Sequence, residues 1–170
     1  MKELFVILVA LINTDRDTDV LSYNPKVTWN NYETVKKEKS YNTLASSNAG
    51  IGYYWNGDKT IDVNFVFNTS KSWVLESAKT TEVLNHEQRH LDLSYLYALK
   101  LVKELRDCQP QSDKEAEKIY WRIDKELWEV QGDYDNEARC KQSQWDKSID
   151  SLIRLYKPYS KPLKKNTKDL

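Results

Sequence analysis

The two histidines of this 170-residue chain stand four residues apart, and a glutamate directly follows the first, in His86-Glu87-Gln88-Arg89-His90. On an α-helix, a spacing of four places both imidazole rings on one face, one turn apart, so that two ring nitrogens can bind one Zn²⁺. Glu87 then lies beside the metal, where its carboxylate can take a proton from metal-activated water. This H-E-x-x-H motif constrains the fold, because it requires a helix here and a third ligand from elsewhere in the chain.

The residues around the motif predict that helix. Apolar residues recur at helical spacing from about Thr80 to Asp107, Thr80 or Thr81 can cap the start, and Gln109-Pro110 ends the pattern. The alternative is that both histidines only decorate an amphipathic helix and bind no metal.

Before this helix the sequence predicts a small antiparallel sheet. A short strand is expected at residues 26–29, and two runs at residues 51–55 and 60–67 flank the turn signal Asn56-Gly57, which predicts a hairpin. Apolar and polar residues alternate in the second run, so one face of the sheet is expected to be buried.

The segment after the metal helix predicts one very long helix or two helices in series. Ser112 and Glu115 form a capping box, and apolar residues keep a helical period from Ala116 to Tyr156. We expect any break at Gly132, because glycine costs about 1 kcal/mol relative to alanine inside a helix. The expected fold class is therefore α+β: a small antiparallel sheet, a zincin-type H-E-x-x-H helix, and a long C-terminal helix or helix pair packed against it.

Charge and hydropathy exclude some functions and suggest a compartment. The 26 basic and 26 acidic residues cancel, so we expect no nucleic-acid partner. The apolar run Leu4 to Ile12 is too short to span a bilayer, which argues against stable membrane insertion, but it fits the core of a secretory signal. We predict a leader over residues 1–15, one domain over residues 20–157 and a flexible basic tail over residues 158–170, with export to the periplasm or the extracellular space. A buried first strand is the alternative for the apolar run.

A third metal ligand is expected from the segment after the metal helix. A closed H-E-x-x-H-x-x-G-x-x-H site would need a histidine at the position of Leu96, so that class is excluded. If Tyr134 and Ala138 mark the inward face of a regular helix, the helical wheel favours Glu137 over Asp135 as the ligand.

Sulfur is a further possibility. Cys140 suits zinc as a thiolate, but a disulfide to Cys108 would remove it from the metal. One disulfide fits an exported protein, and two reduced thiols fit a cytosolic one, so both states stay open.

Several separated motifs occur in one order along the chain. They are Thr28-Trp29-Asn30-Asn31-Tyr32, Ser72-Trp73-Val74, the run from Leu84 to Asp92, and Tyr134-Asp135 with Gln144-Trp145. Together they resemble the bacterial family called domain of unknown function 922, whose members are predicted to be exported zinc-dependent proteases. The similarity extends from about residue 27 to residue 145.

The resemblance favours Asp135 as the third ligand, since Asp135 follows Tyr134 as in that family. This chain departs from the family pattern at Ala138-Arg139-Cys140, where relatives have Thr-x-His, so either Cys140 replaces the histidine or the site is impaired. It also has Arg89 where glycine is usual, and we expect this cation to narrow access or to bind a carboxylate.

The sequence thus predicts a zinc metallopeptidase that acts on a peptide or protein substrate. His86, His90 and Asp135 are the predicted ligands of Zn²⁺, Glu87 is the predicted general base, and Tyr134 is expected to steady the oxyanion through its phenol.

Three alternatives accompany this prediction. Tyr134 can instead be a core aromatic residue, while Asp92 is expected to orient a ligand histidine. The domain as a whole can be a non-catalytic binding or structural module that keeps the peptidase fold. It can also be an intracellular helical interaction protein in which the histidines are coincidental.

Overall fold

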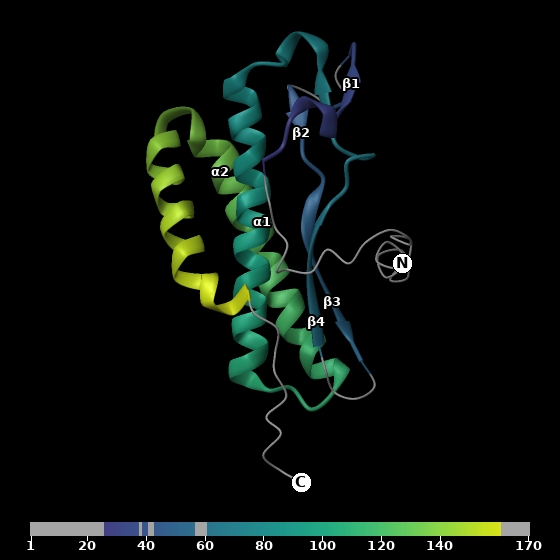
Figure 1. The fold of residues 1–170 in the computed structure, drawn as a ribbon, viewed down its shortest axis with the longest axis vertical. Helices are drawn as coiled ribbons and strands as arrows, with labels where there is room; N and C mark the ends of the chain where they lie inside the picture. Colours follow the sequence, from purple (N-terminus) through teal and green to yellow (C-terminus); the bar gives the residue numbers. More distant parts are fainter. Residues whose placement is uncertain (1–25, 38, 41–42, 57–60, 161–170) are drawn as a thin grey trace.

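The structure, a computed structural model, describes residues 26–37, 39, 40, 43–56 and 61–160 (Figure 1). The predicted leader, Gly57 of the predicted turn and residues 161–170 of the predicted tail lie outside these ranges. None of the helices found within them is both long and apolar enough to cross a membrane.

Helix α1, Thr81–Cys108, carries the H-E-x-x-H motif and begins and ends where the sequence predicts. The Thr80 hydroxyl accepts a hydrogen bond from the Val83 amide at 3.2 Å, which satisfies one of the free donors at the helix start. Gln109 ends the helix in the left-handed region, with φ of 44°, and its amide bonds to the Leu105 carbonyl.

Helix α2, Asp113–Tyr156, is the predicted long C-terminal element, and it is broken at Lys141, where φ is −129° and ψ is 19°. We call residues 113–140 the first arm and residues 142–156 the second arm. Figure 1 shows the first arm behind α1 and the second arm returning beside it, drawn in yellow. The helix-pair alternative is therefore the correct one.

The two arms run in opposite directions along α1. For the first arm, Arg122 bonds to Glu104 at 2.6 Å and Gln131 bonds to Ser94 at 3.1 Å, so this arm is antiparallel to α1. At the second arm, Arg89 bonds to Asp150, and further on the Arg106 guanidinium lies 5.7 Å from the Tyr159 ring, so this arm is parallel to α1.

The predicted break at Gly132 is wrong, because the helix continues through this residue. An added Cβ at Gly132 would meet no atom within 4 Å, so neither crowding nor backbone geometry requires a glycine there. On either side of it, Gln131 and Asp135 contact histidines of α1. Contacts of this kind along the first arm outweigh the weak helix propensity of one glycine.

Two small sheets precede the helices. Strands β3, Ala49–Trp55, and β4, Ile61–Phe67, form the predicted antiparallel hairpin. Strand β5, Trp73–Leu75, lies between β1, Glu33–Val35, which is parallel to it, and β2, Ala45–Ser46, which is antiparallel. The α+β class and the order of sheet and helices are confirmed, but the second sheet is mixed rather than antiparallel.

The strand predicted at residues 26–29 is wrong. Trp29–Asn31 forms a 3₁₀ helix instead, because the Thr28 amide donates to the Asn31 side-chain oxygen at 2.8 Å and closes a tight turn. The first strand, β1, begins only at Glu33.

Helix α1 packs against the hairpin and against both arms of α2, and the first arm also contacts the hairpin through Tyr120. Buried side chains from all of these elements share one apolar cluster, which includes Phe65 of β4, Leu99 of α1, and Ile123 and Ile149 of the two arms. Each fully buried aliphatic side chain of this kind contributes about 1.5–3 kcal/mol to folding. This packing determines which side chains of the two helices meet.

Candidate metal site

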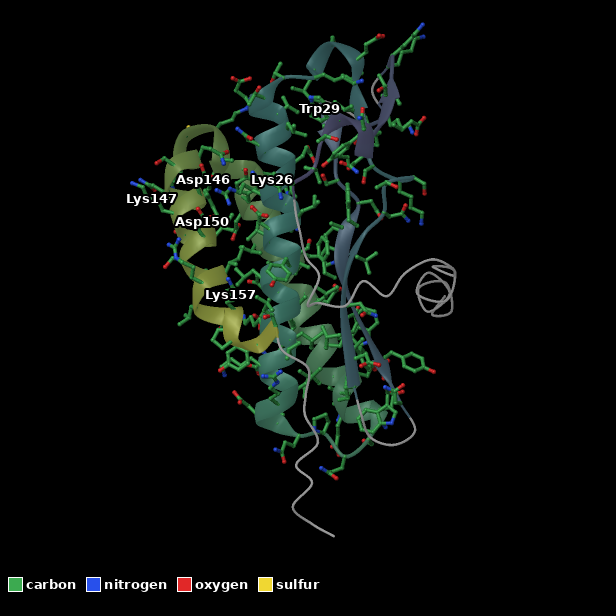
Figure 2. All side chains as sticks on the ribbon, in the orientation of Figure 1. Lys26, Trp29, Asp146, Lys147, Asp150 and Lys157 are labelled. Carbon is green, nitrogen blue, oxygen red and sulfur yellow. The ribbon has the colours of Figure 1, made fainter. Side chains whose placement is uncertain are left out.

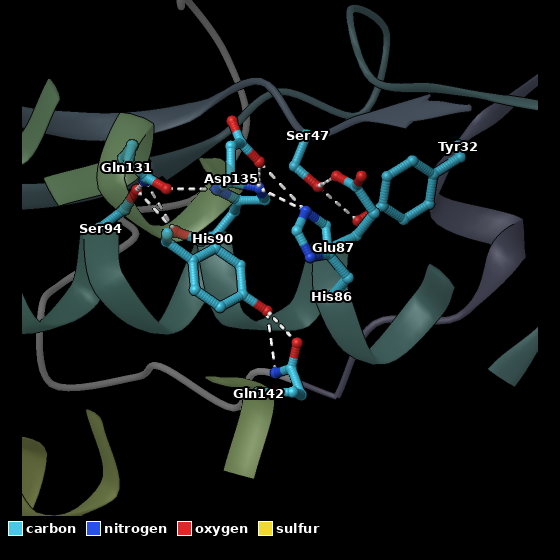
Figure 3. Close-up of polar contacts among 10 residues, drawn as sticks. Tyr32, Ser47, His86, Glu87, His90, Ser94, Gln131, Asp135 and Gln142 are labelled. Atoms are coloured by element: carbon cyan, nitrogen blue, oxygen red, sulfur yellow. Dashed lines mark hydrogen bonds and ion pairs between the residues drawn. The ribbon is translucent and has the colours of Figure 1, made fainter. Parts of the chain in front are cut away.

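The side chains of His86, His90 and Asp135 converge at the first arm of α2 (Figure 3). Nε2 of His86 lies 3.1 Å from Nε2 of His90 and 3.1 Å from Oδ1 of Asp135, and Nε2 of His90 lies 2.9 Å from that same oxygen. Ligands held about 2.0–2.1 Å from a tetrahedral zinc ion are about 3.3 Å apart. Two imidazoles and a carboxylate at these separations fit a zinc site with one open position.

The antiparallel packing of the first arm on α1 brings these residues together. His86 and His90 lie one turn apart near the start of α1, and Asp135 lies 49 residues after His86 in the chain, near the end of the first arm. Asp135 is thus the candidate that reaches the histidines. Among the described residues, Glu137 pairs with Lys141 at 3.0 Å and Cys140 is an exposed free thiol, as is Cys108.

The helical-wheel preference for Glu137 fails for an identifiable reason. Tyr134 and Ala138 are both buried, so the inward face of the arm is the expected one. A wheel gives that face and the residue on each side of it, but it does not give the side on which the partner helix lies. The histidines of α1 lie on the Asp135 side, and only the packing of the two helices determines this.

The charges of Asp135 and the two histidines affect one another, and the cluster is exposed to solvent at Asp135. The Asp135 side chain is 59% exposed, whereas that of His90 is 14% exposed. Burial alone would raise the pKa of Asp135, but hydrogen bonds from His86 and His90 and their charges outweigh it and hold that pKa well below its usual range. Burial also disfavours the charged form of His90 and by itself would lower its pKa. The contact with Asp135 and the charge of Glu87 outweigh burial, so the pKa of His90 is raised overall.

Glu87 is buried, with 4% of its surface exposed, and a side chain from the connection between β2 and β3 binds it. The Ser47 hydroxyl donates to Oε2 of Glu87 at 2.7 Å, and the Tyr32 hydroxyl lies 2.7 Å from Ser47 Oγ (Figure 3). A serine hydroxyl has one hydrogen, so Tyr32 must donate to Ser47. Burial raises the pKa of Tyr32, which keeps this donor protonated.

Ser47 is held in place by contacts of its two neighbours, Ser46 and Asn48, with strand β5 and the residue before it. Its neighbour Ser46 pairs with Trp73 in the sheet, and the amide of Asn48 donates to Ser72 Oγ at 2.9 Å. Ser72 is fully buried and donates in turn to the Asn68 carbonyl at 2.8 Å. The Ser72-Trp73-Val74 segment therefore supports the residue that binds Glu87.

Tyr134 is fully buried beneath the histidines. Its ring stacks on that of His86, with centroids 4.7 Å apart and planes at 21°, and it meets the His90 ring edge-on at 5.0 Å. Its hydroxyl pairs with the amide of Gln142, and burial raises its pKa to about 12. These contacts support the expectation of a core aromatic residue rather than that of an oxyanion donor.

The remaining motif residues bind other parts of the chain. Arg89 donates to Asp92 at 2.8 Å, to Asp146 at 2.9 Å and to Asp150 at 2.7 Å, so it binds carboxylates as expected, but those of its own chain. Asp146 and Asp150 stand on the side of the second arm that faces α1, and Lys147 stands on its outer side (Figure 2).

We expected Asp92 to orient a ligand histidine, but the residue that contacts Nδ1 of His90 is Gln131. Asp92 accepts hydrogen bonds from Gln88 and Arg89, while the acceptor at Nδ1 of His90 is the side chain of Gln131. Gln88 also accepts from the Val27 amide at 3.1 Å, which ties the N-terminal segment to α1.

Sequence reasoning missed Tyr32, Ser47 and Gln131. Tyr32 belongs to a motif of the resemblance that assigned it no role, and nothing in the sequence around Ser47 connects it to a glutamate 40 residues away. Gln131 does carry a signal, because it precedes Asp135 by four residues and must share its helix face.

No protein family, curated protein or solved structure matches this chain. The resemblance to domain of unknown function 922 therefore stays a prediction, and the geometry of the site is the basis for assigning a function.

Proposed function

We propose that this protein is a zinc-dependent metallohydrolase that cleaves peptide bonds, with His86, His90 and Asp135 as the metal ligands. The observation that carries the proposal is the convergence of three ligand atoms, 2.9–3.1 Å apart, beside a buried glutamate. When bound at such a site, Zn²⁺ lowers the pKa of a coordinated water toward about 7 and polarises a carbonyl group. Export from the cytoplasm and a peptide substrate belong to the same proposal.

In this proposal Glu87 moves the proton. Ser47 occupies Oε2 of Glu87, so Oε1 is the atom that takes a proton from the attacking water and returns it to the leaving amine. The hydrogen bond from Ser47 also limits the rotation of the carboxylate. General acid–base catalysis of this type contributes about 10²–10⁴-fold to a rate.

The first experiment measures the zinc content of the purified domain by elemental mass spectrometry, alongside His86→Ala/His90→Ala. We expect about one zinc per chain, lost in the double variant. Wild-type protein that binds no zinc even when zinc is offered would overturn the proposal.

The second experiment measures the hydrolysis of fluorescein-labelled casein by Glu87→Gln, with Glu137→Gln as the matched control on a glutamate outside the cluster. Glu87→Gln should keep its zinc and lose hydrolysis, and Glu137→Gln should keep both. Full hydrolysis by the Glu87 variant would contradict the assigned mechanism.

A structural role for the cluster is the second candidate. Asp135 bonds to both histidines and so links α2 to α1 without any metal. If this link is the only role of the cluster, the protein purifies without zinc, and the double histidine variant lowers its stability without changing its metal content.

A further inference from the structure

We propose that Gln131 is a positioning residue that holds His90 in the tautomer with hydrogen on Nδ1, so that Nε2 is free to bind the metal. The metal-binding part of this inference rests on the proposed function. The hydrogen on Nδ1 follows from the hydrogen bonds of Gln131, while Oδ1 of Asp135, 2.9 Å from Nε2, is a second acceptor on the same ring when no metal is bound.

Gln131 lies on the first arm, one turn before Asp135, and all of its side-chain polar atoms are engaged (Figure 3). Its Oε1 accepts from Nδ1 of His90, and its Nε2 donates to the His90 carbonyl at 3.0 Å and to Ser94 Oγ at 3.1 Å. Ser94 is fully buried, and its hydroxyl donates to that same carbonyl at 3.1 Å.

These partners determine which way the amide of Gln131 points. A carbonyl oxygen only accepts, and Ser94 has already given its one hydrogen to the His90 carbonyl. The side-chain atom of Gln131 that faces both oxygens must therefore be the NH₂ group. The reversed amide would place an oxygen against two other oxygens about 3 Å away, with no hydrogen available between them.

The orientation of the amide in turn determines the hydrogen on His90. Because Oε1 of Gln131 faces Nδ1, this ring nitrogen must carry a hydrogen. When the ring is neutral, its one hydrogen is then on Nδ1 and Nε2 has a lone pair for the metal. Nε2 is also the atom of His90 that lies within 3.1 Å of both other cluster residues.

His86 offers an internal comparison, because it is held differently. Its ring stacks on Tyr134, whereas His90 is held by the amide of Gln131. The chain has two histidines, so two sets of ring signals can be followed and assigned with the single alanine variants. A change at Gln131 should alter the His90 signals and leave those of His86 nearly unchanged.

Four variants test the assignment. Gln131→Met keeps the length of the side chain and removes all of its hydrogen bonds, and Gln131→Glu restores an acceptor for Nδ1. Ser94→Ala removes one of the two groups that orient the amide. Gln144→Ala is the matched control, because Gln144 is an exposed glutamine on the second arm.

The first measurement is which ring nitrogens of each histidine carry hydrogen, by long-range ¹H–¹⁵N NMR on the zinc-free protein. We expect hydrogen on Nδ1 of His90 in the wild type and in Gln144→Ala, and hydrogen on Nε2 alone in Gln131→Met, where Oδ1 of Asp135 is the acceptor that the ring keeps. A wild-type His90 without hydrogen on Nδ1 would overturn the inference, whatever the protein does with zinc.

The second measurement is zinc affinity, by competition with a chromophoric chelator. Loss of a group that orients a metal-binding histidine typically weakens metal affinity about 10–100-fold, and we expect this for Gln131→Met. Gln131→Glu should return only part of the affinity, because its carboxylate keeps an acceptor for Nδ1 but turns a second oxygen toward the His90 carbonyl, and Ser94→Ala should show a smaller loss. Affinity within about twofold of the wild type in a folded Gln131→Met protein would also overturn the inference.

The two proposals fail in different ways. Wild-type protein with His90 in the Nδ1–H form but with no affinity for zinc would overturn the proposed function and support the assignment of Gln131. If Gln131→Met does not fold, the wild-type tautomer and the zinc affinities of Gln131→Glu and Ser94→Ala decide the question.

Discussion

The two arms of α2 pack on the same helix, α1, but they contact different residues of it and in different ways. The first arm contributes Gln131 and Asp135 to the candidate metal site, and its Tyr134 lies beneath the histidines. The second arm meets α1 through Asp146 and Asp150, which both bind Arg89. The first arm supplies the side chains of the candidate site, and the second arm anchors the helix pair and holds the Tyr134 hydroxyl through Gln142.

The two arms differ in their contacts because the five consecutive residues 86–90 of α1 point in different directions. His86 and His90 face the first arm, Arg89 faces the second arm, and Glu87 faces Ser47 near the strands. Gln88 binds the N-terminal segment at Val27. Successive residues of a helix point about 100° apart, so a short motif at the centre of a fold can bind four separate neighbours.

The largest effect is expected at the first arm, from Asp135→Ala. Removing one of three proposed ligands should weaken zinc binding by about 100-fold or more, since even outer partners of a ligand typically contribute 10–100-fold. Stability without metal should change little, because the Asp135 side chain is mostly exposed and its ion pairs are screened. Chelator competition and chemical unfolding measure the two effects, and Glu137→Ala, two residues further along, is the control.

The opposite result, a loss of stability with zinc binding kept, is expected from Arg89→Met, which removes the ion pairs of Arg89 with the second arm. It also removes the Arg89 guanidinium from Asp92, which is 6% exposed, while Asp146 and Asp150 can turn to solvent. Because two of the three carboxylates are partly exposed, we expect a loss of about 3 kcal/mol in the free energy of unfolding, at the lower end for broken buried pairs. Lys147→Met on the outer side of the same arm should cost almost nothing. A loss of zinc without a loss of stability would break the distinction between the arms.

A smaller effect is expected from Ser47→Ala. Ser47 contacts Glu87 of α1 but belongs to neither arm of α2. The substitution removes a hydrogen bond to a buried carboxylate, so the free energy of unfolding should fall by about 1.5–3 kcal/mol while zinc content stays the same. Ser47→Thr keeps the hydroxyl and should recover most of the loss, and Ser46→Ala is the control on the adjacent residue. Zinc lost together with the hydroxyl would mean that Glu87 and the metal ligands are one unit.

The smallest effect is expected from Gly132→Ala, and it is stabilising. Gly132 lies inside the first arm without a positive φ, and a Cβ there would meet no atom within 4 Å. Replacing glycine by alanine should therefore raise the free energy of unfolding by about 0.5–1 kcal/mol, which thermal unfolding can detect. A destabilised variant would show that the arm bends at this glycine in solution.

Local patterns in the sequence determined much of this molecule. The Thr80 cap, the spacing of His86 and His90, and the alternation in β4 each depend on neighbours a few residues away, and the helix starts and the hairpin were predicted from them. The inward face of the first arm was predicted in the same way from Tyr134 and Ala138.

Only the tertiary structure decided that Asp135, which the resemblance favoured and the helical wheel did not, contacts both histidines. It alone also decided the break at Lys141 and the hydroxyl that binds Glu87. Each of these depends on how one element lies against another, because it joins side chains that are up to 49 residues apart. That arrangement follows from burying the apolar faces of α1, α2 and the hairpin together, which is a property of the whole core. The spacing of residues in any one segment carries no information about it.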